Sequence, residues 1–307
     1  MNQRMRAVRA YTALVFAAGS WGVATATAKY AVGPLGAFTT LIIELAAAMA
    51  VLLPAAAVRR VRRSVPLRRY LLLGFVEPAV AYGALDLGLQ RTSAGDAALL
   101  DGLQSCIVLV LGVLLIKEAV TRRSVLGVVV ATVGGAMLAG AHPTAQAMLG
   151  DSLVLLGSLA ASWSVILVSK LAEHASALEL TAYQFGVGFC FTLPLTLIAW
   201  ASGAERVPTL HDLPYIAAAA GIGLVGFGAG YLLYNYAIAH VPVGVAGMAL
   251  NIIPLFGVGT AVFALGEQLG AWELVGGALI VTGVALFPYE TKEIQVAEDE
   301  AVKAGAA

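Results

Sequence analysis

Charged residues are scarce in this sequence. Asp, Glu, Lys and Arg together make up 12% of its 307 residues, about half of the roughly 25% found in an ordinary soluble domain. Hydrophobic residues make up 60% of the chain, and the mean hydropathy is +0.89. A soluble protein of this length could not cover its surface with so few charges. The composition therefore excludes a soluble globular protein and predicts a polytopic, all-α membrane protein.

Cysteine and histidine are also rare. The two cysteines, Cys106 and Cys190, lie inside apolar runs, so a disulfide framework is not expected. The four histidines are scattered near loops, and the chain contains neither H-E-x-x-H nor G-x-S-x-G. We predict no metal, no cofactor and no nucleic-acid partner, and we keep an intramembrane enzyme only as the alternative from another functional class.

Ten apolar segments are expected to cross the bilayer, each close to the length of about 20 residues that a span requires. They are 10–31, 39–58, 70–89, 94–116, 124–141, 152–172, 179–201, 213–238, 243–265 and 271–287. Fifteen Lys and Arg residues fall on the side of the N-terminus, and only Lys29, Arg91 and Arg206 on the other side. The positive-inside rule then places both termini in the cytoplasm. We predict a multi-pass protein of a bacterial-type inner membrane, with a disordered tail at 294–307.

The chain carries an internal repeat. An offset of 149 residues aligns 92–138 with 241–287, and it also pairs Tyr82 with Tyr231. The chain is therefore predicted to hold two five-helix units, 1–147 and 148–293. Because five is odd, the second unit enters the membrane upside down. Inverted repeats of this kind are typical of carriers that work by alternating access.

The same offset pairs two glutamates, Glu118 and Glu267, in the polar seams that precede the last span of each unit. We expect both to be structural, each accepting hydrogen bonds from backbone N–H groups at the start of the next helix. A direct part in transport is the alternative.

Several motifs together resemble those of a known family. "SW" occurs in the first and sixth spans, Y-x-x-x-A-x-x-x-V-P begins at residue 234, and Pro254 precedes Glu267 by thirteen residues. In this register the chain resembles the drug/metabolite transporter superfamily, in its EamA-domain branch, over about residues 10–288. One departure is Ser105, where the family usually has proline.

The resemblance implies a ten-helix secondary transporter, either monomer or homodimer, that exports amino acids or related metabolites. It also implies a central cavity lined by spans 1, 3, 4, 6, 8 and 9, with spans 5 and 10 in a more peripheral position. No Walker motif is present, so gradients would supply the energy. A multidrug exporter or a sugar or nucleotide-sugar carrier of the same fold is the alternative.

Polar side chains inside the spans are the candidate substrate-binding residues, because an ionisable or polar group at mid-membrane is costly. Glu77 is followed by Pro78, which is expected to bend the third span. Glu77 is a candidate for substrate binding or proton coupling, with a structural partnership as the alternative. The full predicted set is Trp21, Glu77, Tyr82, Asp101, Gln104, Trp163, Tyr231, Tyr234, Asn235 and Asn251, with hinges at Pro78 and Pro254.

Spacing supports parts of this set. Asp101 and Gln104 are three residues apart, and Tyr231, Tyr234 and Asn235 form one helical stripe. The alternative for the stripe is hydrogen bonding between helices. Trp21 and Trp163 occupy equivalent places and are expected to form cavity walls, with ordinary packing as the alternative.

Other polar or glycine-rich features receive a more structural interpretation. Asp86 lies near the outer interface and is expected to be solvated or paired, and Glu44 is expected to be mainly structural. The segment "GIGLVG" at 221–226 fits the dinucleotide fingerprint but lies inside an apolar span. Its glycines are expected to let helices approach closely or bend.

Overall fold

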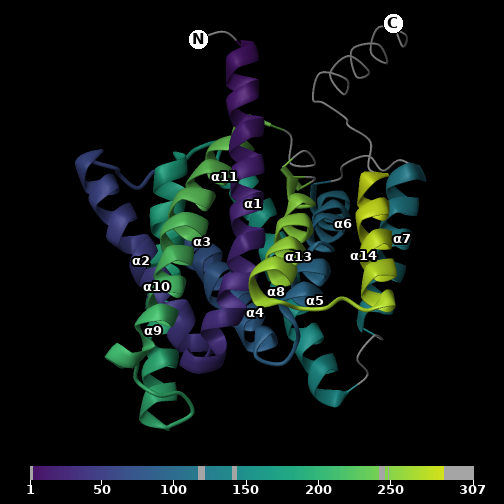
Figure 1. Cartoon of the computed structure of the whole chain (residues 1–307). Coiled ribbons are helices and arrows are strands. Elements are labelled where there is room, and N and C mark those ends of the chain that lie inside the picture. The colour runs from purple at the N-terminus through teal and green to yellow at the C-terminus, as the bar shows by residue number, and fades with distance from the viewer. Residues whose placement is uncertain (1–2, 117–121, 140–143, 242–245, 248, 287–307) are drawn as a thin grey trace, which may run out of the picture.

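The computed structural model describes residues 3–116, 122–139, 144–241, 246–247 and 249–286, and no strand occurs among them. Figure 1 shows a bundle of helices whose axes run mostly along one direction. Six helical segments are long and apolar enough to cross a membrane, and shorter apolar helices accompany them. The all-helical prediction is confirmed for these residues, whereas ten crossings stay a prediction. Glu118 and the tail at 294–307 lie outside the described residues.

The described residues of the first part of the chain, 3–116 and 122–139, form seven α-helices and one π-helix. In order they are α1 (Gln3–Leu35), α2 (Ala37–Val58), α3 (Leu67–Gly74), the π-helix η1 (Phe75–Val80), α4 (Ala81–Leu89), α5 (Ala94–Asp101), α6 (Gln104–Ile116) and α7 (Arg122–Ala139). The predicted third span is thus α3, η1 and α4, and the predicted fourth span is α5 and α6.

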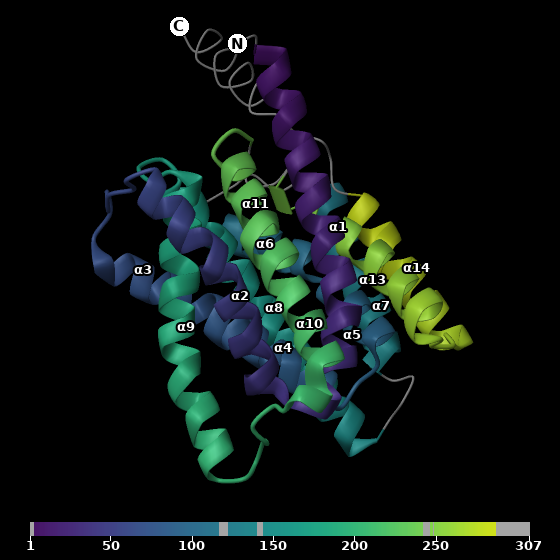
Figure 2. The ribbon, with the colours of Figure 1, turned by 60° about the vertical axis from the view of Figure 1, so that its left-hand side comes forward.

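The second part continues from residue 145. Its elements are α8 (Ala145–Leu171), α9 (Ala177–Ala201), the short η2 (Leu210–Asp212), α10 (Leu213–Ile222), the π-helix η3 (Gly223–Gly230), α11 (Tyr231–Ile238), α13 (Ile252–Leu265) and α14 (Ala271–Ala285). The start of α1 and the end of α14 lie at the same end of the molecule (Figures 1 and 2).

Sequence explains two of the helix interruptions. Pro78 has no N–H to donate, and Glu77 immediately before it leaves the helical region with φ −147° and ψ 121°. The predicted bend at this point is therefore present. The second interruption, η3, contains four glycines in eight residues, and the backbone of Gly223 lies against the carbonyl of Glu44 on α2. The glycines of the false dinucleotide motif thus permit both a π-helix and a close helix contact.

Glycine also brings α7 and α14 together. A Cβ atom on Gly134 would lie 2.5 Å from the carbonyl oxygen of Gly276, and one on Gly283 would lie 2.5 Å from that of Gly127. Such backbone proximity is how small residues drive helix association in membranes. The two helices lie side by side at one edge of the molecule in both views (Figures 1 and 2), which agrees with their expected peripheral position.

Glu267 binds the start of a helix, as predicted, but the helix is a different one. Its two carboxylate oxygens accept hydrogen bonds from the N–H groups of Ala94 and Gly95, both at 2.9 Å. These groups begin α5, whereas the prediction named the helix that follows Glu267, which is α14. Glu205 acts similarly on α2, where it accepts from the N–H groups of Phe38 at 3.0 Å and Thr39 at 2.8 Å.

The ion pair between Arg206 and Asp212 fixes the loop before α10. The hydrogen bond to Asp212 raises the pKa of the Arg206 guanidinium above its ordinary value, so this charge persists at any physiological pH. Asp212 also accepts a hydrogen bond from the backbone N–H of Thr209 at 2.8 Å.

Candidate functional site

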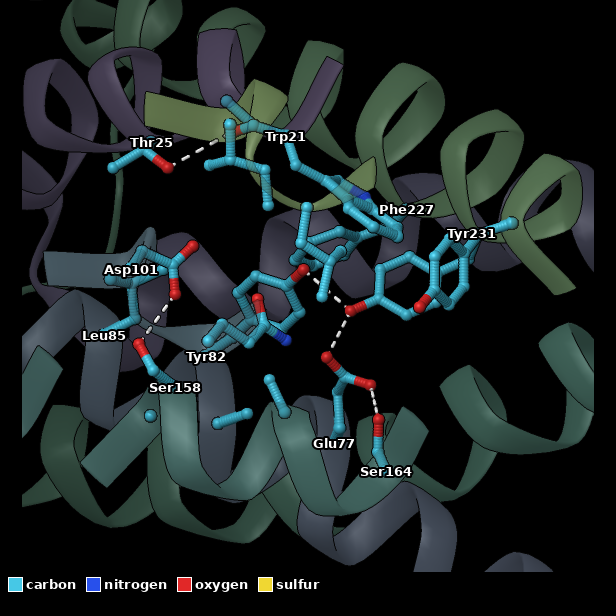
Figure 3. Close-up of a pocket in the computed structure, with 18 of the residues that line it drawn as sticks. Trp21, Thr25, Glu77, Tyr82, Leu85, Asp101, Ser158, Ser164, Phe227 and Tyr231 are labelled. Carbon is cyan, nitrogen blue, oxygen red and sulfur yellow. Dashed lines mark hydrogen bonds between the residues drawn. The ribbon is translucent and has the colours of Figure 1, made fainter. Parts of the chain in front are cut away.

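A cavity lies at the centre of the bundle (Figure 3). It has a volume of about 50 Å³ and is bounded by α1, α2, η1, α4, α5, α6, α8 and the segment from α10 to α11, together with residues 250 and 253. Eight of the ten predicted substrate-binding residues line it, namely Trp21, Glu77, Tyr82, Asp101, Gln104, Tyr231, Tyr234 and Asn235. The structure therefore brings most of the predicted set together from distant parts of the chain.

Glu77 is the centre of a hydrogen-bonded group in this cavity. Its Oε1 accepts from the hydroxyl of Tyr231 at 2.5 Å, and its Oε2 accepts from the hydroxyl of Ser164 and from Nε2 of Gln184, the latter at 3.3 Å. The Tyr231 hydroxyl also lies 2.8 Å from that of Tyr82. All of these partners are neutral, and no ion pair of Glu77 occurs among the described residues. The carboxyl is therefore held by neutral hydrogen-bond donors, two of which, Ser164 and Tyr231, are drawn in Figure 3.

Asp101 occupies a second acidic position, at the opposite end of the view in Figure 3. It is the last residue of α5, and its Oδ1 accepts from the hydroxyl of Ser158 at 2.7 Å. Ser158 and Ser164 are six residues apart on α8, which corresponds to about 9 Å along the helix axis. The helix α8 thus donates a hydrogen bond to both carboxyls, in each case from a serine hydroxyl.

Aromatic rings pack around the carboxyl groups. The ring of Trp21 lies 4.7 Å from that of Tyr231 and 5.1 Å from that of Tyr234, between centroids. The ring of Phe227 lies 4.4 Å from that of Tyr82. Trp21 also donates its Nε1–H to the carbonyl oxygen of Gly226 at 2.9 Å, a carbonyl within η3. The tryptophan therefore joins α1 to the π-helix at the wall of the cavity.

Two members of the predicted set lie elsewhere. Trp163 does not line the cavity and is 45% exposed, so the symmetry with Trp21 does not extend to its environment. Asn251 precedes α13 and is also absent from the lining. Pro254 lies in the first turn of α13, where a proline is tolerated, and its Cγ faces Gly102, 2.5 Å from where a Cβ would be.

Several lining residues were missed or misread from the sequence. Asp86 was expected to be solvated or paired near the outer interface, but it is 1% exposed and lines the cavity. Glu44 is equally buried and adds α2, which the family resemblance did not include, to the lining helices. Both could have been identified from the sequence as lining residues, because an acidic group inside a span is costly and by default marks a functional position. Ser158 and Ser164 could not have been identified in this way, because serine is common at helix contacts in membranes.

The cavity is narrow. A volume of about 50 Å³ holds one or two water molecules, since each occupies roughly 30 Å³ in the liquid. Sites for small organic ligands usually measure about 300–1,000 Å³. An organic molecule can enter only after the surrounding helices have moved apart.

The sequence profile described as the EamA-like transporter family matches the chain twice, at residues 8–140 and 148–288. A solved crystal structure is similar over 93% of this chain and 96% of its own, with a TM-score of 0.65 and 17% identity, a similarity that concerns the fold.

Three curated relatives are transporters by name. "Uncharacterized transporter YetK" of Bacillus subtilis (strain 168) is 24% identical, and the match covers 67% of this chain and 63%, less than two thirds, of that relative. "Probable terminal-alkyne amino-acid exporter" of Streptantibioticus cattleyicolor is 28% identical over 67% of this chain and 68% of the relative. "Probable amino-acid metabolite efflux pump" of Salmonella typhimurium is 27% identical over 70% and 73%.

These names describe transporters rather than enzymes, and six helices of the described chain are long and apolar enough to cross the membrane in which a transporter works. Because the family profile spans nearly the whole described chain, the protein belongs to the EamA-like transporter family.

Proposed function

We propose that the protein is a secondary transporter that exports small molecules bearing amino groups, amino acids among them, by alternating access around the central cavity. The observation that carries this proposal is the narrow central cavity itself. It is lined from both parts of the chain, it contains a hydrogen-bonded carboxyl at Glu77, and it is too small to admit a cargo without movement.

The proposed architecture has ten spans in two inverted five-helix repeats, 1–147 and 148–293, with both termini in the cytoplasm of a bacterial-type cell. The double match of the family profile supports the two repeats. The glycine contacts between α7 and α14 are reciprocal at an offset of 149, since Gly134 meets Gly276 and Gly283 meets Gly127. A two-fold relation produces this pattern.

Two further observations support the inversion. Tyr82 and Tyr231, which the offset equates, touch each other through their hydroxyls, as residues on a two-fold axis do. The helices α2 and α9 pack against each other and run in opposite directions (Figures 1 and 2). They occupy equivalent places in the proposed repeats, and an inverted second repeat requires opposite directions.

The moving parts of the proposed cycle are the interrupted helices that border the cavity. The third span is interrupted at η1, the fourth between α5 and α6, and the eighth at η3. Irregular backbone at membrane depth is tolerated where it lines a cavity, and broken helices surround the cargo site in many carriers. We assign the hinges to Pro78 and Pro254.

The assignment to amino acids rests on the names of two relatives and on the groups in the cavity. The carboxyls of Glu77 and Asp101 are suited to an ammonium group. The hydroxyl of Tyr234 and the amide of Asn235 lie in the same lining and are suited to a polar substituent of the cargo.

The test is uptake of radiolabelled amino acids into proteoliposomes containing the purified protein. We expect flux above that of empty liposomes, reduced at least tenfold by Tyr231→Ala, Asn235→Ala and Glu77→Gln. Tyr30→Ala is the matched control, because Tyr30 is 43% exposed and lies outside the cavity. Flux that is unchanged in all three cavity variants would overturn the site, and no flux for any cargo bearing an amino group would overturn the function.

A further inference from the structure

We propose that the cavity selects cargo with a net positive charge, namely basic amino acids and primary amines, over zwitterions. This inference rests on the proposed export function and concerns the charge of the cargo at the same site.

Four carboxyl groups from four elements line the cavity. They are Glu44 on α2, Glu77 on η1, Asp86 on α4 and Asp101 on α5. Among the described lining residues, none is Lys, Arg or His. Within the described chain, none of the four carboxyls forms an ion pair. A buried acidic group without a counter-ion is costly in an apolar medium, and a cationic cargo would supply the missing charge.

In two of these carboxyls, one oxygen atom has no hydrogen-bond partner among the described atoms. Glu44 and Asp86 are each 1% exposed, and neither Oε1 of Glu44 nor Oδ2 of Asp86 has a partner among the described atoms of the protein. The hydroxyl of Tyr234, in the same lining, is likewise without a partner. An unsatisfied buried acceptor lowers the stability of the protein, and a charged one lowers it further. An ammonium group, with three N–H donors and no acceptor, complements such oxygens.

The aromatic rings favour an organic ammonium over an inorganic ion. The rings of Tyr231 and Tyr234 each pack tilted against that of Trp21 within the lining, at centroid distances of 4.7 and 5.1 Å. Aromatic side chains attract ammonium groups through their electron-rich faces. In addition, no three His, Cys, Asp or Glu side chains of the described chain are grouped so as to hold a metal ion.

A cargo carboxylate finds no cationic side chain in the described lining. Lys29 belongs to α1 but does not line the cavity. Its Nζ donates to the carbonyl oxygens of Leu89 at 2.6 Å and Thr92 at 2.7 Å. A free carboxylate in the cavity would instead face four acidic groups, and it is repelled by each of them that is ionised. Repulsion of this kind discriminates between cargoes as effectively as attraction does.

Proteoliposome uptake at matched concentrations tests the selection, with labelled lysine, tyramine, phenylalanine and glutamate as cargoes. We expect lysine and tyramine to exceed phenylalanine at least tenfold in kcat/KM, and glutamate not to be transported. Transport of lysine alone would assign basic amino acids, and transport of tyramine would extend the class to amines. Phenylalanine carried as well as or better than both would overturn the inference and leave the export function intact, whereas no transport of any of them would overturn the function itself.

Variants of Glu44 and Asp86, the two carboxyls with an unsatisfied oxygen, distinguish a role in recognising the cargo from a role in folding. We expect Glu44→Gln and Asp86→Asn to lower the ratio of lysine to phenylalanine transport about tenfold, because each removes charge while keeping size. Glu179→Gln is the matched control, since Glu179 is 3% exposed but lies outside the cavity. If the two carboxyls had a purely structural role, their variants would lower the transport of lysine and of phenylalanine equally. An unchanged ratio in both cavity variants would therefore overturn the inference. If a variant is too unstable to reconstitute, the melting temperature of the wild-type protein is measured with each cargo. A rise with lysine but not with phenylalanine would support the inference, and an equal or larger rise with phenylalanine would overturn it.

Discussion

At the scale of single residues, the site depends on one carboxyl solvated by neutral donors. Glu77 accepts hydrogen bonds from Ser164, Gln184 and Tyr231, and Tyr82 reaches it only through Tyr231. The arrangement stabilises the carboxylate without neutralising it. The group is therefore able to attract a cation, which a preformed salt bridge would prevent.

This chain of hydroxyls makes a prediction about two tyrosines. Tyr231→Phe removes a hydrogen bond to the Glu77 carboxyl, worth about 1.5–3 kcal/mol when that carboxyl is ionised, so we expect kcat/KM to fall about tenfold or more. Tyr82→Phe removes a bond between two neutral hydroxyls and should have the smaller effect. Transport by the two variants in proteoliposomes checks the order, with Tyr30→Phe as control. Equal losses in the two cavity variants would contradict the proposed role of Tyr231.

Much of the site could be predicted at this scale, because helical spacing alone places Tyr231, Tyr234 and Asn235 on one face. The errors came from position along the span. Asp86 was placed at the outer interface by counting residues, but the sequence does not show that α2 and α8 cover it there. Trp163 was assigned by symmetry with Trp21, and symmetry of sequence does not ensure the same packing.

At the scale of helices, contacts between backbones decide where the elements lie. The backbones of α7 and α14 lie so close together that there is no room for a side chain at Gly134 or Gly283. The family resemblance predicted the peripheral place of these helices. Their register against each other could not be predicted, because every glycine in a glycine-rich span is an equal candidate for a close contact.

Adding a side chain to either glycine should separate the two helices. We expect Gly134→Leu and Gly283→Leu each to destabilise the protein by at least 1–3 kcal/mol, the range for overpacking a closely packed interior. The reciprocal contacts predict similar losses at the two positions. Gly259→Leu on α13 is the control, because nothing lies within 4 Å of a Cβ there. Thermal unfolding in detergent measures the effect, and a control as damaging as the other two would contradict the packing argument.

The carboxylate of Glu267 provides the second prediction for an element. Glu267→Ala leaves the first N–H groups of α5 without their acceptors, and loss of a helix cap costs about 0.5–2 kcal/mol. We expect a lower melting temperature, with Glu173→Ala as control, since Glu173 is exposed after α8. Because α5 ends at Asp101, we also expect the variant to transport more slowly. A melting temperature equal to that of the control would contradict the proposed cap.

At the scale of the whole molecule, the proposed mechanism requires the second repeat to be inverted. Hydropathy and the distribution of Lys and Arg predict this from the sequence. The loop from 59 to 66 carries Arg59, Arg60, Arg62 and Arg63, whereas the loop from 202 to 209 carries only Arg206. The two loops lie at opposite ends of the bundle, and α1 begins at the end nearer the first (Figure 1).

Cysteine accessibility tests this arrangement directly. In a background with Cys106→Ala and Cys190→Ala, we expect Ser202→Cys to react with a membrane-impermeant maleimide on intact cells. Arg62→Cys should react only in permeabilised cells or inverted vesicles. Both positions are exposed, so a failure to react reports the side of the membrane rather than burial. Labelling of both positions from the same side would contradict the inverted second repeat. Without the inversion, equivalent movements of the two halves could not open the cavity to each face of the membrane in turn.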